Sequence, residues 1–105
     1  MAERLNVVPE DLRRAAREHR ETADQLAAVP AGNAEVMASL ESLGPIFADL
    51  CDAGQELLDQ RRACYEQQAA AHADLAEQLG RAADVWEQQD AEGAERLRAV
   101  AEAGP

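Results

Sequence analysis

The chain has 105 residues, of which 21 are acidic and ten are basic, and its formal net charge at pH 7 is -11. A chain of this length fits one small domain with little interior unless a partner shares its core, and an acidic surface repels phosphate, which disfavours nucleic acid as a partner. The 24 alanines outnumber eight Val, Ile and Thr residues, so the composition favours helix and predicts an all-α fold.

The N-terminal segment MAERLNVVPEDL predicts a short irregular lead over residues 1 to 7. It has no basic stretch followed by an apolar core, and no segment of the chain approaches the roughly 20 apolar residues that cross a bilayer. We therefore expect neither a cleavable signal peptide nor membrane insertion.

The first helix is expected over residues 9 to 28. Pro9 suits the first helical position, and Glu10 and Asp11 lie at the positive end of the helix dipole. Apolar or weakly polar residues recur at alternating spacings of four and three and form a narrow seam. The seam contains Leu12, Ala16, His19, Ala23 and Leu26, and it implies a partner helix.

The bend between the helices is expected within residues 29 to 45. The stretch VPAGN, residues 29 to 33, should end the first helix and let a short helical segment restart with Asn33 as its N-cap. The pair Gly44 and Pro45 marks a second break, because proline suits the first turn of the helix that follows. We assign Gly44 and Pro45 to the bend between the two main helices.

The second helix is expected over residues 45 to 90. Gly93 and the terminal EAGP suggest a frayed or short helical tail over residues 91 to 105. The apolar residues of the second helix fall on one gently drifting stripe. The stripe comprises Ile46, Leu50, Ala53, Leu57, Cys64, Ala71, Leu75, Ala82 and Trp86. Gln60 and Gln78 interrupt it.

Together these elements predict a single domain, residues 1 to 105, folded as an antiparallel helical hairpin with a long second helix. Two helices leave one side of their shared seam exposed, and pairing hairpins into a four-helix bundle is the usual way to cover it. We therefore expect a dimer, with a second copy or with a different hairpin. The expected interface residues are Leu12, Leu26, Leu50, Leu57, Leu75 and Leu79.

The two cysteines, Cys51 and Cys64, are 13 positions apart in the expected second helix. At 1.5 Å rise per residue they lie about 20 Å apart, so they cannot form a disulfide within that helix. Small, partly buried thiols are the favoured interpretation. An intermolecular disulfide remains the alternative.

Residues able to carry chemistry form no known catalytic arrangement. The sequence has no H-E-x-x-H, C-x-x-C, glycine-rich phosphate loop or G-x-S-x-G motif, and its acidic residues do not follow the pattern of a calcium loop. His19 fits packing in the seam, and His72 fits the surface. We expect no enzyme activity, no cofactor and no metal site.

Three sequence segments resemble the EspC-like family of proteins associated with ESX (type VII) secretion, distant relatives of the WxG helical-hairpin proteins of actinobacteria. They are LNVVPEDL near the N-terminus, LGPIFADL at mid-chain and AADVWEQQDAE near the C-terminus. The resemblance covers nearly the whole chain. It implies a non-enzymatic protein that is cytoplasmic before export and then secreted or associated with the cell envelope.

The resemblance also implies an export signal. Relatives carry Tyr-x-x-x-Asp or Tyr-x-x-x-Glu just after the second helix or in its last turns, and Trp86 and Asp90 occupy the matching positions. The implied partners are the secretion ATPase or other export machinery and a second helical hairpin. Two departures stand out, because Trp86 replaces the customary tyrosine and no WxG tripeptide occurs at the bend.

Two interpretations of the same residues remain. Four-residue spacing puts the indole of Trp86 and the carboxylate of Asp90 on one helix face, where a receptor could bind both. Packing of Trp86 against the first helix would also explain the tryptophan.

For the whole protein, the alternative to an exported substrate is an intracellular helical adaptor or chaperone that binds another helical protein. Assembly into longer polymers is a third, less favoured interpretation.

Overall fold

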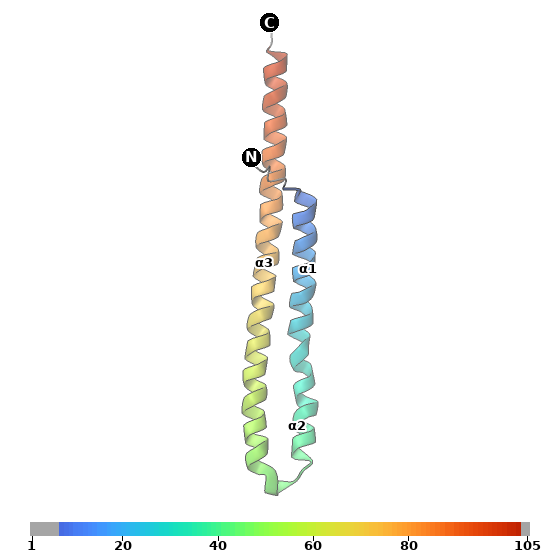
Figure 1. The fold of residues 1–105 in the computed structure, drawn as a ribbon, viewed down its shortest axis with the longest axis vertical. Coiled ribbons are helices and arrows are strands. Elements are labelled where there is room, and N and C mark those ends of the chain that lie inside the picture. Colours follow the sequence, from blue (N-terminus) through green and yellow to red (C-terminus); the bar gives the residue numbers. More distant parts are fainter. Residues whose placement is uncertain (1–6, 104–105) are drawn as a thin grey trace, which may run out of the picture. The chain divides into compact units, whose positions relative to one another are not determined.

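The computed structural model describes residues 7 to 103, and every regular element in that range is helical (Figure 1). The order is α1 (Pro9–Ala28), the 3-10 turn η1 (Val29–Gly32), α2 (Asn33–Glu41), the 3-10 turn η2 (Pro45–Phe47) and α3 (Ala48–Glu102). The chain is an all-α helical hairpin with a longer second helix, which confirms the predicted fold class. Most of the predicted N-terminal lead and the last two residues of the predicted tail lie outside the described range.

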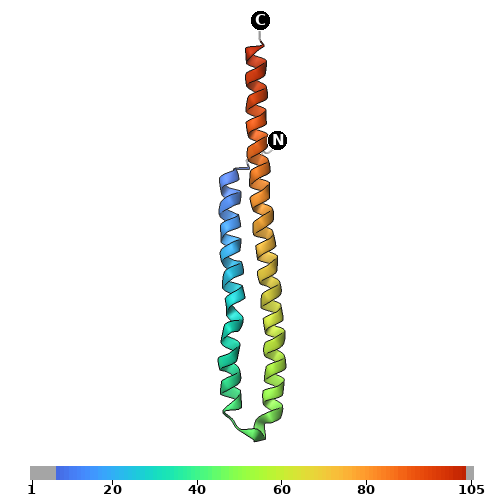
Figure 2. The same ribbon diagram turned by 180° about the vertical axis from the view of Figure 1, so that it is seen from behind.

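The helices divide into two compact units. Unit 1 comprises Met1–His19 and Asp74–Pro105, and unit 2 comprises Arg20–Ala73. In unit 1 the start of α1 lies beside the C-terminal part of α3, and in unit 2 the end of α1, η1 and α2 lie beside the first part of α3 (Figures 1 and 2). Each unit is therefore an antiparallel helix pair.

The N-terminus of α1 follows the local signals. Val8 accepts backbone hydrogen bonds from Asp11 (3.0 Å) and Leu12 (3.3 Å), and Glu10 and Asp11 occupy the first turn. The predicted seam of α1 is its covered side: Ala23 is buried, and Leu12, Ala16, His19 and Leu26 are half-buried. The prediction that this seam faces another helix is confirmed within the chain itself.

Asn33 does not cap α2, so that prediction is wrong. It is the first residue of the helix, whose N-cap is Gly32 without a side-chain cap. The buried Asn33 side chain instead donates a hydrogen bond from Nδ2 to the backbone oxygen of Leu58 in α3, at 3.2 Å. A contact with the neighbouring helix has replaced the local cap, and the sequence of α2 alone carries no sign of it.

The reversal of direction lies between Glu41 and Ala48. Gly44 is in an extended conformation at φ 95° and ψ 174°, and among the described residues it is the one glycine with positive φ. This region of φ and ψ is essentially restricted to glycine. Gly44 donates to the backbone oxygen of Glu41 (3.2 Å) and accepts from Phe47 (3.1 Å), so it links the end of α2 to η2.

The covered face of α3 is displaced from the stripe that we expected. The buried residues are Leu58, Ala69, Ala76 and Ala83, whereas Leu50, Leu57, Leu75 and Trp86 of the predicted stripe are exposed. Because one residue turns a helix by about 100°, a shift of one position moves the covered face to the neighbouring side. Alanines dominate this face, and the larger apolar side chains are left outside.

The second helix also ends later than expected. We placed its end near residue 90, but α3 continues to Glu102. Side-chain contacts four residues apart support the extension: Gln88 donates to Glu92 (3.2 Å), and Arg96 forms an ion pair with Glu92 (4.0 Å). Gly93 therefore does not end the helix.

Candidate functional site

The predicted signal residues lie on the C-terminal part of α3 in unit 1. Trp86 is 40% exposed, and Asp90, one helical turn further on, is also exposed. The four-residue spacing places both side chains on one side of the helix. More than half of the Trp86 surface is nevertheless covered. Trp86 is therefore partly packed against the protein and partly accessible to another molecule.

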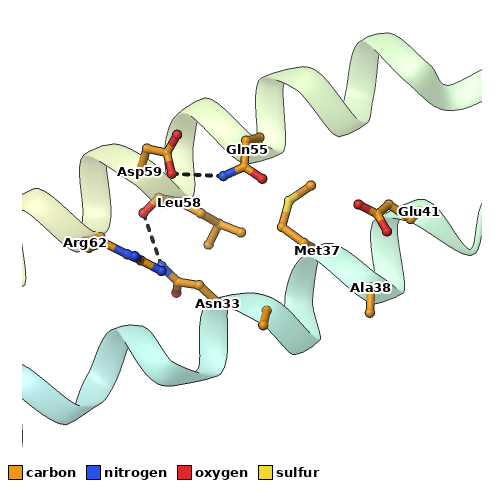
Figure 3. Close-up of a pocket in the computed structure, with 9 residues that line it drawn as sticks. Asn33, Met37, Ala38, Glu41, Gln55, Leu58, Asp59 and Arg62 are labelled. Carbon is orange, nitrogen blue, oxygen red and sulfur yellow. Dashed lines mark hydrogen bonds between the residues drawn. The ribbon is translucent and has the colours of Figure 1, made fainter.

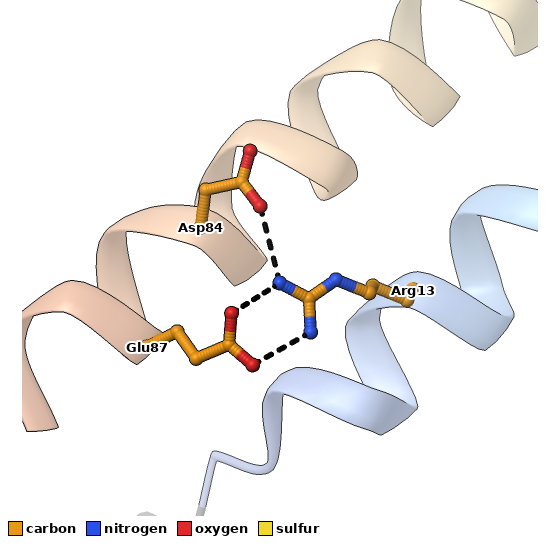
Figure 4. A network of polar contacts seen from close by, with 3 residues as sticks. All are labelled: Arg13, Asp84 and Glu87. Carbon is orange, nitrogen blue, oxygen red and sulfur yellow. Dashed lines mark hydrogen bonds and ion pairs between the residues drawn. The ribbon is translucent and has the colours of Figure 1, made fainter. Parts of the chain in front are cut away.

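A charged cluster joins α1 to α3 next to this segment (Figure 4). Arg13 Nη1 donates to Glu87 Oε1 at 3.0 Å, and Arg13 Nη2 donates to Glu87 Oε2 at 2.6 Å and to Asp84 Oδ1 at 3.1 Å. The guanidinium thus binds Glu87 with both of its terminal nitrogens, a geometry that a lysine cannot reproduce. The cluster links the first turns of α1 to the turn of α3 that carries Trp86.

Contacts in the cluster shift the pKa values of Glu87 and Arg13. The hydrogen bonds from Arg13, followed by its positive charge, lower the pKa of Glu87 below the ordinary glutamate value. The pKa of Arg13 is raised in turn, chiefly by its hydrogen bonds to Glu87 and then to Asp84. Both shifts favour the charged forms of Arg13 and Glu87.

The six predicted interface leucines fall into two groups. Leu50, Leu57 and Leu75 are exposed, and Leu57 keeps 66% of its surface accessible. Leu12, Leu26 and Leu79 are half-buried. Among the described residues no large side chain is fully buried, so the chain leaves much of its apolar surface uncovered, which suggests a partner.

Unit 2 contains a shallow groove of about 320 Å³ between α2 and α3 (Figure 3). Met37 and Leu58 contribute apolar surface, and on the rim Gln55 Nε2 donates to Asp59 Oδ1 at 2.9 Å. Its lining consists of Asn33, Ala34, Met37, Ala38, Glu41, Gln55, Leu58, Asp59 and Arg62. This lining contains no serine, cysteine or histidine.

The other candidates for chemistry are dispersed. His19 and His72 are both half-buried, which differs from the surface position expected for His72. Both cysteines are free thiols; Cys51 is half-buried, but Cys64 is exposed and accepts a hydrogen bond from Gln68. Within residues 7 to 103, no group of three or more His, Cys, Asp and Glu side chains could hold a metal ion. No helix in this range has the length and apolar character needed to cross a membrane.

Sequence reasoning missed the Arg13 cluster, because Arg13 lies outside the predicted apolar seam of the first helix. A usable signal was present in the sequence. Asp84 and Glu87 are three residues apart and share a helix face, and an antiparallel hairpin brings that face to the N-terminal end of α1. The register that selects Arg13 over Arg14 or Arg17 depends on the packing of the two helices.

Comparison with known proteins identifies related sequences. The family described as excreted virulence factor EspC, type VII ESX diderm, matches residues 1–99. Uncharacterized proteins of Mycobacterium bovis and of two Mycobacterium tuberculosis strains are each 49% identical over 90 residues, which cover 86% of this chain and 86% of each relative. No solved structure matches the chain.

Proposed function

Because the chain belongs to the EspC family of proteins excreted by type VII (ESX) systems, we propose that its C-terminal helix carries the export signal and that Trp86 and Asp90 are read there. The observation that carries the proposal is the exposure of both residues one turn apart on α3 of unit 1. The receptor is the secretion ATPase or another part of the export machinery.

The two side chains suit recognition by a protein pocket. An indole provides a large apolar surface that is costly to leave in water and is frequent among binding hot spots. The carboxylate of Asp90 accepts hydrogen bonds from the pocket wall. Trp86 lacks the phenolic hydroxyl of the tyrosine usual in relatives, so its polar contact is donation from the indole N–H.

We further propose that the protein acts by association and not by catalysis. The family is not known for enzyme activity, and the leucines left exposed support a helical partner. Leu50 and Leu57 in unit 2 and Leu75 in unit 1 are the most accessible members of the proposed interface, while Leu12, Leu26 and Leu79 would complete it from half-buried positions. Pairing with a second hairpin into a four-helix bundle is the arrangement that would cover them.

The export signal is tested by replacing both Trp86 and Asp90 with alanine and measuring the protein in culture supernatant and in cell lysate. We expect the variant to accumulate in the lysate and to disappear from the supernatant. A matched control replaces Val85 and Gln89, which have the same spacing on a neighbouring, exposed side of α3. Circular dichroism establishes that both variants remain helical.

Normal export of the Trp86 and Asp90 variant, with its helix content intact, would show that the signal lies elsewhere. Loss of export in the Val85 and Gln89 control as well would show that the whole segment is read without preference for the proposed residues. Either result would require the signal assignment to be abandoned.

A further inference from the structure

One side of α3 in unit 1 carries a continuous row of residues, which we call the C-terminal strip. It consists of Leu75, Leu79, Ala82, Trp86, Asp90, Gly93, Leu97 and Val100. From Leu75 to Leu97 the spacings of four, three and four repeat every 11 residues, and an 11-residue repeat keeps nearly the same side of an α-helix because it corresponds to 3.67 residues per turn. Val100 follows Leu97 by three residues and lies on the same side. The strip is about 38 Å long at 1.5 Å per residue.

The second half of the strip has no cover. Leu97 is 73% exposed and Val100 is 72% exposed, and every residue from 94 to 102 is exposed. The last turns of α3 continue past the first residue of α1 (Figure 1). Leu97 and Val100 thus place two large, mostly accessible apolar side chains on one side of the helix. A surface of this type commonly binds another helix.

Asp90 interrupts the strip in a way that specifies the partner. Its side chain makes no hydrogen bond or ion pair with any other residue in the described range, whereas Arg13 is bound to Asp84 and Glu87, and Arg96 lies within 4.0 Å of Glu92. Covering the strip would remove Asp90 from water. Because an unpaired carboxylate is costly to bury, the covering helix must bring its own positive charge to this position.

The overall charge disfavours a second copy as the occupant. The segment from 84 to 102 contains six acidic residues and two arginines, and the whole chain has a net charge of -11. Pairing two such segments would place like charges side by side, which opposes association.

We propose that the C-terminal strip docks an amphipathic helix of a different polypeptide, which covers Trp86, Leu97 and Val100 with apolar side chains and pairs one basic side chain with Asp90. This proposal goes beyond the export signal and does not depend on it. The strip includes Leu97 and Val100, which the signal does not use, so the two proposals can fail separately.

Two synthetic helical peptides test the charge requirement on the full-length protein. Both carry leucines at the spacings of the strip and no aromatic residue; one has arginine and the other glutamate at the position facing Asp90. Trp86 is the only tryptophan in the chain, so its fluorescence reports binding directly. We expect the arginine peptide to shift Trp86 emission to shorter wavelength and to bind about tenfold more tightly than the glutamate peptide.

Three variants make this measurement specific. Asp90→Asn should abolish the preference for arginine, and Asp90→Arg should reverse it in favour of the glutamate peptide. Leu97→Asp should prevent binding of both peptides. Glu95→Gln is the matched control, because Glu95 is an exposed acidic residue on the opposite side of α3, and it should leave both affinities unchanged.

The natural occupant is tested by placing a photo-crosslinking amino acid at position 97 in the native organism and identifying the cross-linked peptide. A helix of another polypeptide, with an arginine or lysine within one turn of the cross-link, supports the proposal. A cross-link to a second copy, or a purified protein that is a dimer and dissociates on Leu97→Asp, overturns it. Equal affinities for the two peptides overturn it as well. Normal export of Leu97→Asp, alongside failed export of the Trp86 and Asp90 variant, separates docking from the signal.

Discussion

The bend offers the sharpest test of how this sequence produces its fold, because Gly44 has the conformation least compatible with a side chain. At φ 95° and ψ 174° any L-residue with a Cβ is strained. A Cβ at this position would meet no atom within 4 Å. The cost of Gly44→Ala is therefore a backbone cost without a contribution from tertiary clashes.

The expected loss of stability in Gly44→Ala follows from the strained backbone and from the open space around a Cβ at this position. Holding a non-glycine residue in such a region costs on the order of 1 to 3 kcal/mol, and we expect Gly44→Ala to lower the free energy of unfolding by about that amount. Gly80→Ala is the matched control. Gly80 lies inside α3 with no atom within 4 Å of a Cβ built there, so alanine should raise the free energy of unfolding by roughly 0.5 to 1 kcal/mol through helix propensity.

Urea unfolding followed by circular dichroism at 222 nm measures both variants at the same protein concentration. The same chemical change, glycine to alanine, should lower the free energy of unfolding at position 44 and raise it at position 80. If Gly44→Ala is as stable as the parent while Gly80→Ala is stabilised, the bend does not require a residue that tolerates positive φ. If both are destabilised, helix propensity does not govern α3 at position 80.

The remaining predictions concern packing and charge. Leu58→Ala should lower the free energy of unfolding by about 2 to 4 kcal/mol because Leu58 is 7% exposed, whereas Leu57→Ala should change it by less than about 0.5 kcal/mol; equal effects in urea unfolding would show that the covered face of α3 is misassigned. Asn33→Ala should cost roughly 1 kcal/mol through loss of the hydrogen bond to Leu58, measured in the same way, and no loss would show that the bond contributes nothing. Because the pKa of Glu87 is lowered in the folded protein, its contribution is fully present above the ordinary glutamate pKa and is lost as pH falls through the lowered value. Thermal melts should therefore separate Glu87→Gln from the parent at neutral pH and converge in acid, and a difference that persists in acid would contradict the ion-pair explanation.

The limits of sequence-based prediction are clearest on α3. Leu50, Leu57, Leu75 and Trp86 do form a row of apolar side chains on one side of α3, as expected. The side that the neighbouring helix covers is a different one, which contains Leu58, Ala76 and Ala83. Both rows satisfy helical periodicity. Alanines permit close approach of the neighbouring helix, and periodicity does not reveal which of two adjacent rows the neighbour will cover.

In the candidate site, too, some features could be predicted from local spacing and others depend on how the helices pack. Trp86 and Asp90 could be placed on one side of a helix from their spacing alone. Leu97 and Val100 could have been added by continuing spacings of three and four residues past residue 90. They were missed because Gly93 and the terminal residues suggested fraying. The Arg13 contacts with Asp84 and Glu87 depend on the register between α1 and α3, which no local pattern specifies.

By itself, the sequence determined the helical character of the protein, the start of its first helix, the position of the bend at Gly44 and Pro45, and the acidic, apolar-striped nature of its C-terminal helix. These properties follow from short-range effects: propensity, fixed φ of proline, the freedom of glycine and the period of the α-helix. Only the tertiary structure decided which side of α3 is covered, which arginine binds Glu87 and why Asn33 bonds across to Leu58 instead of capping its own helix. Those choices depend on how two helices slide and rotate against each other, and that is set by the summed contacts of residues far apart in the chain.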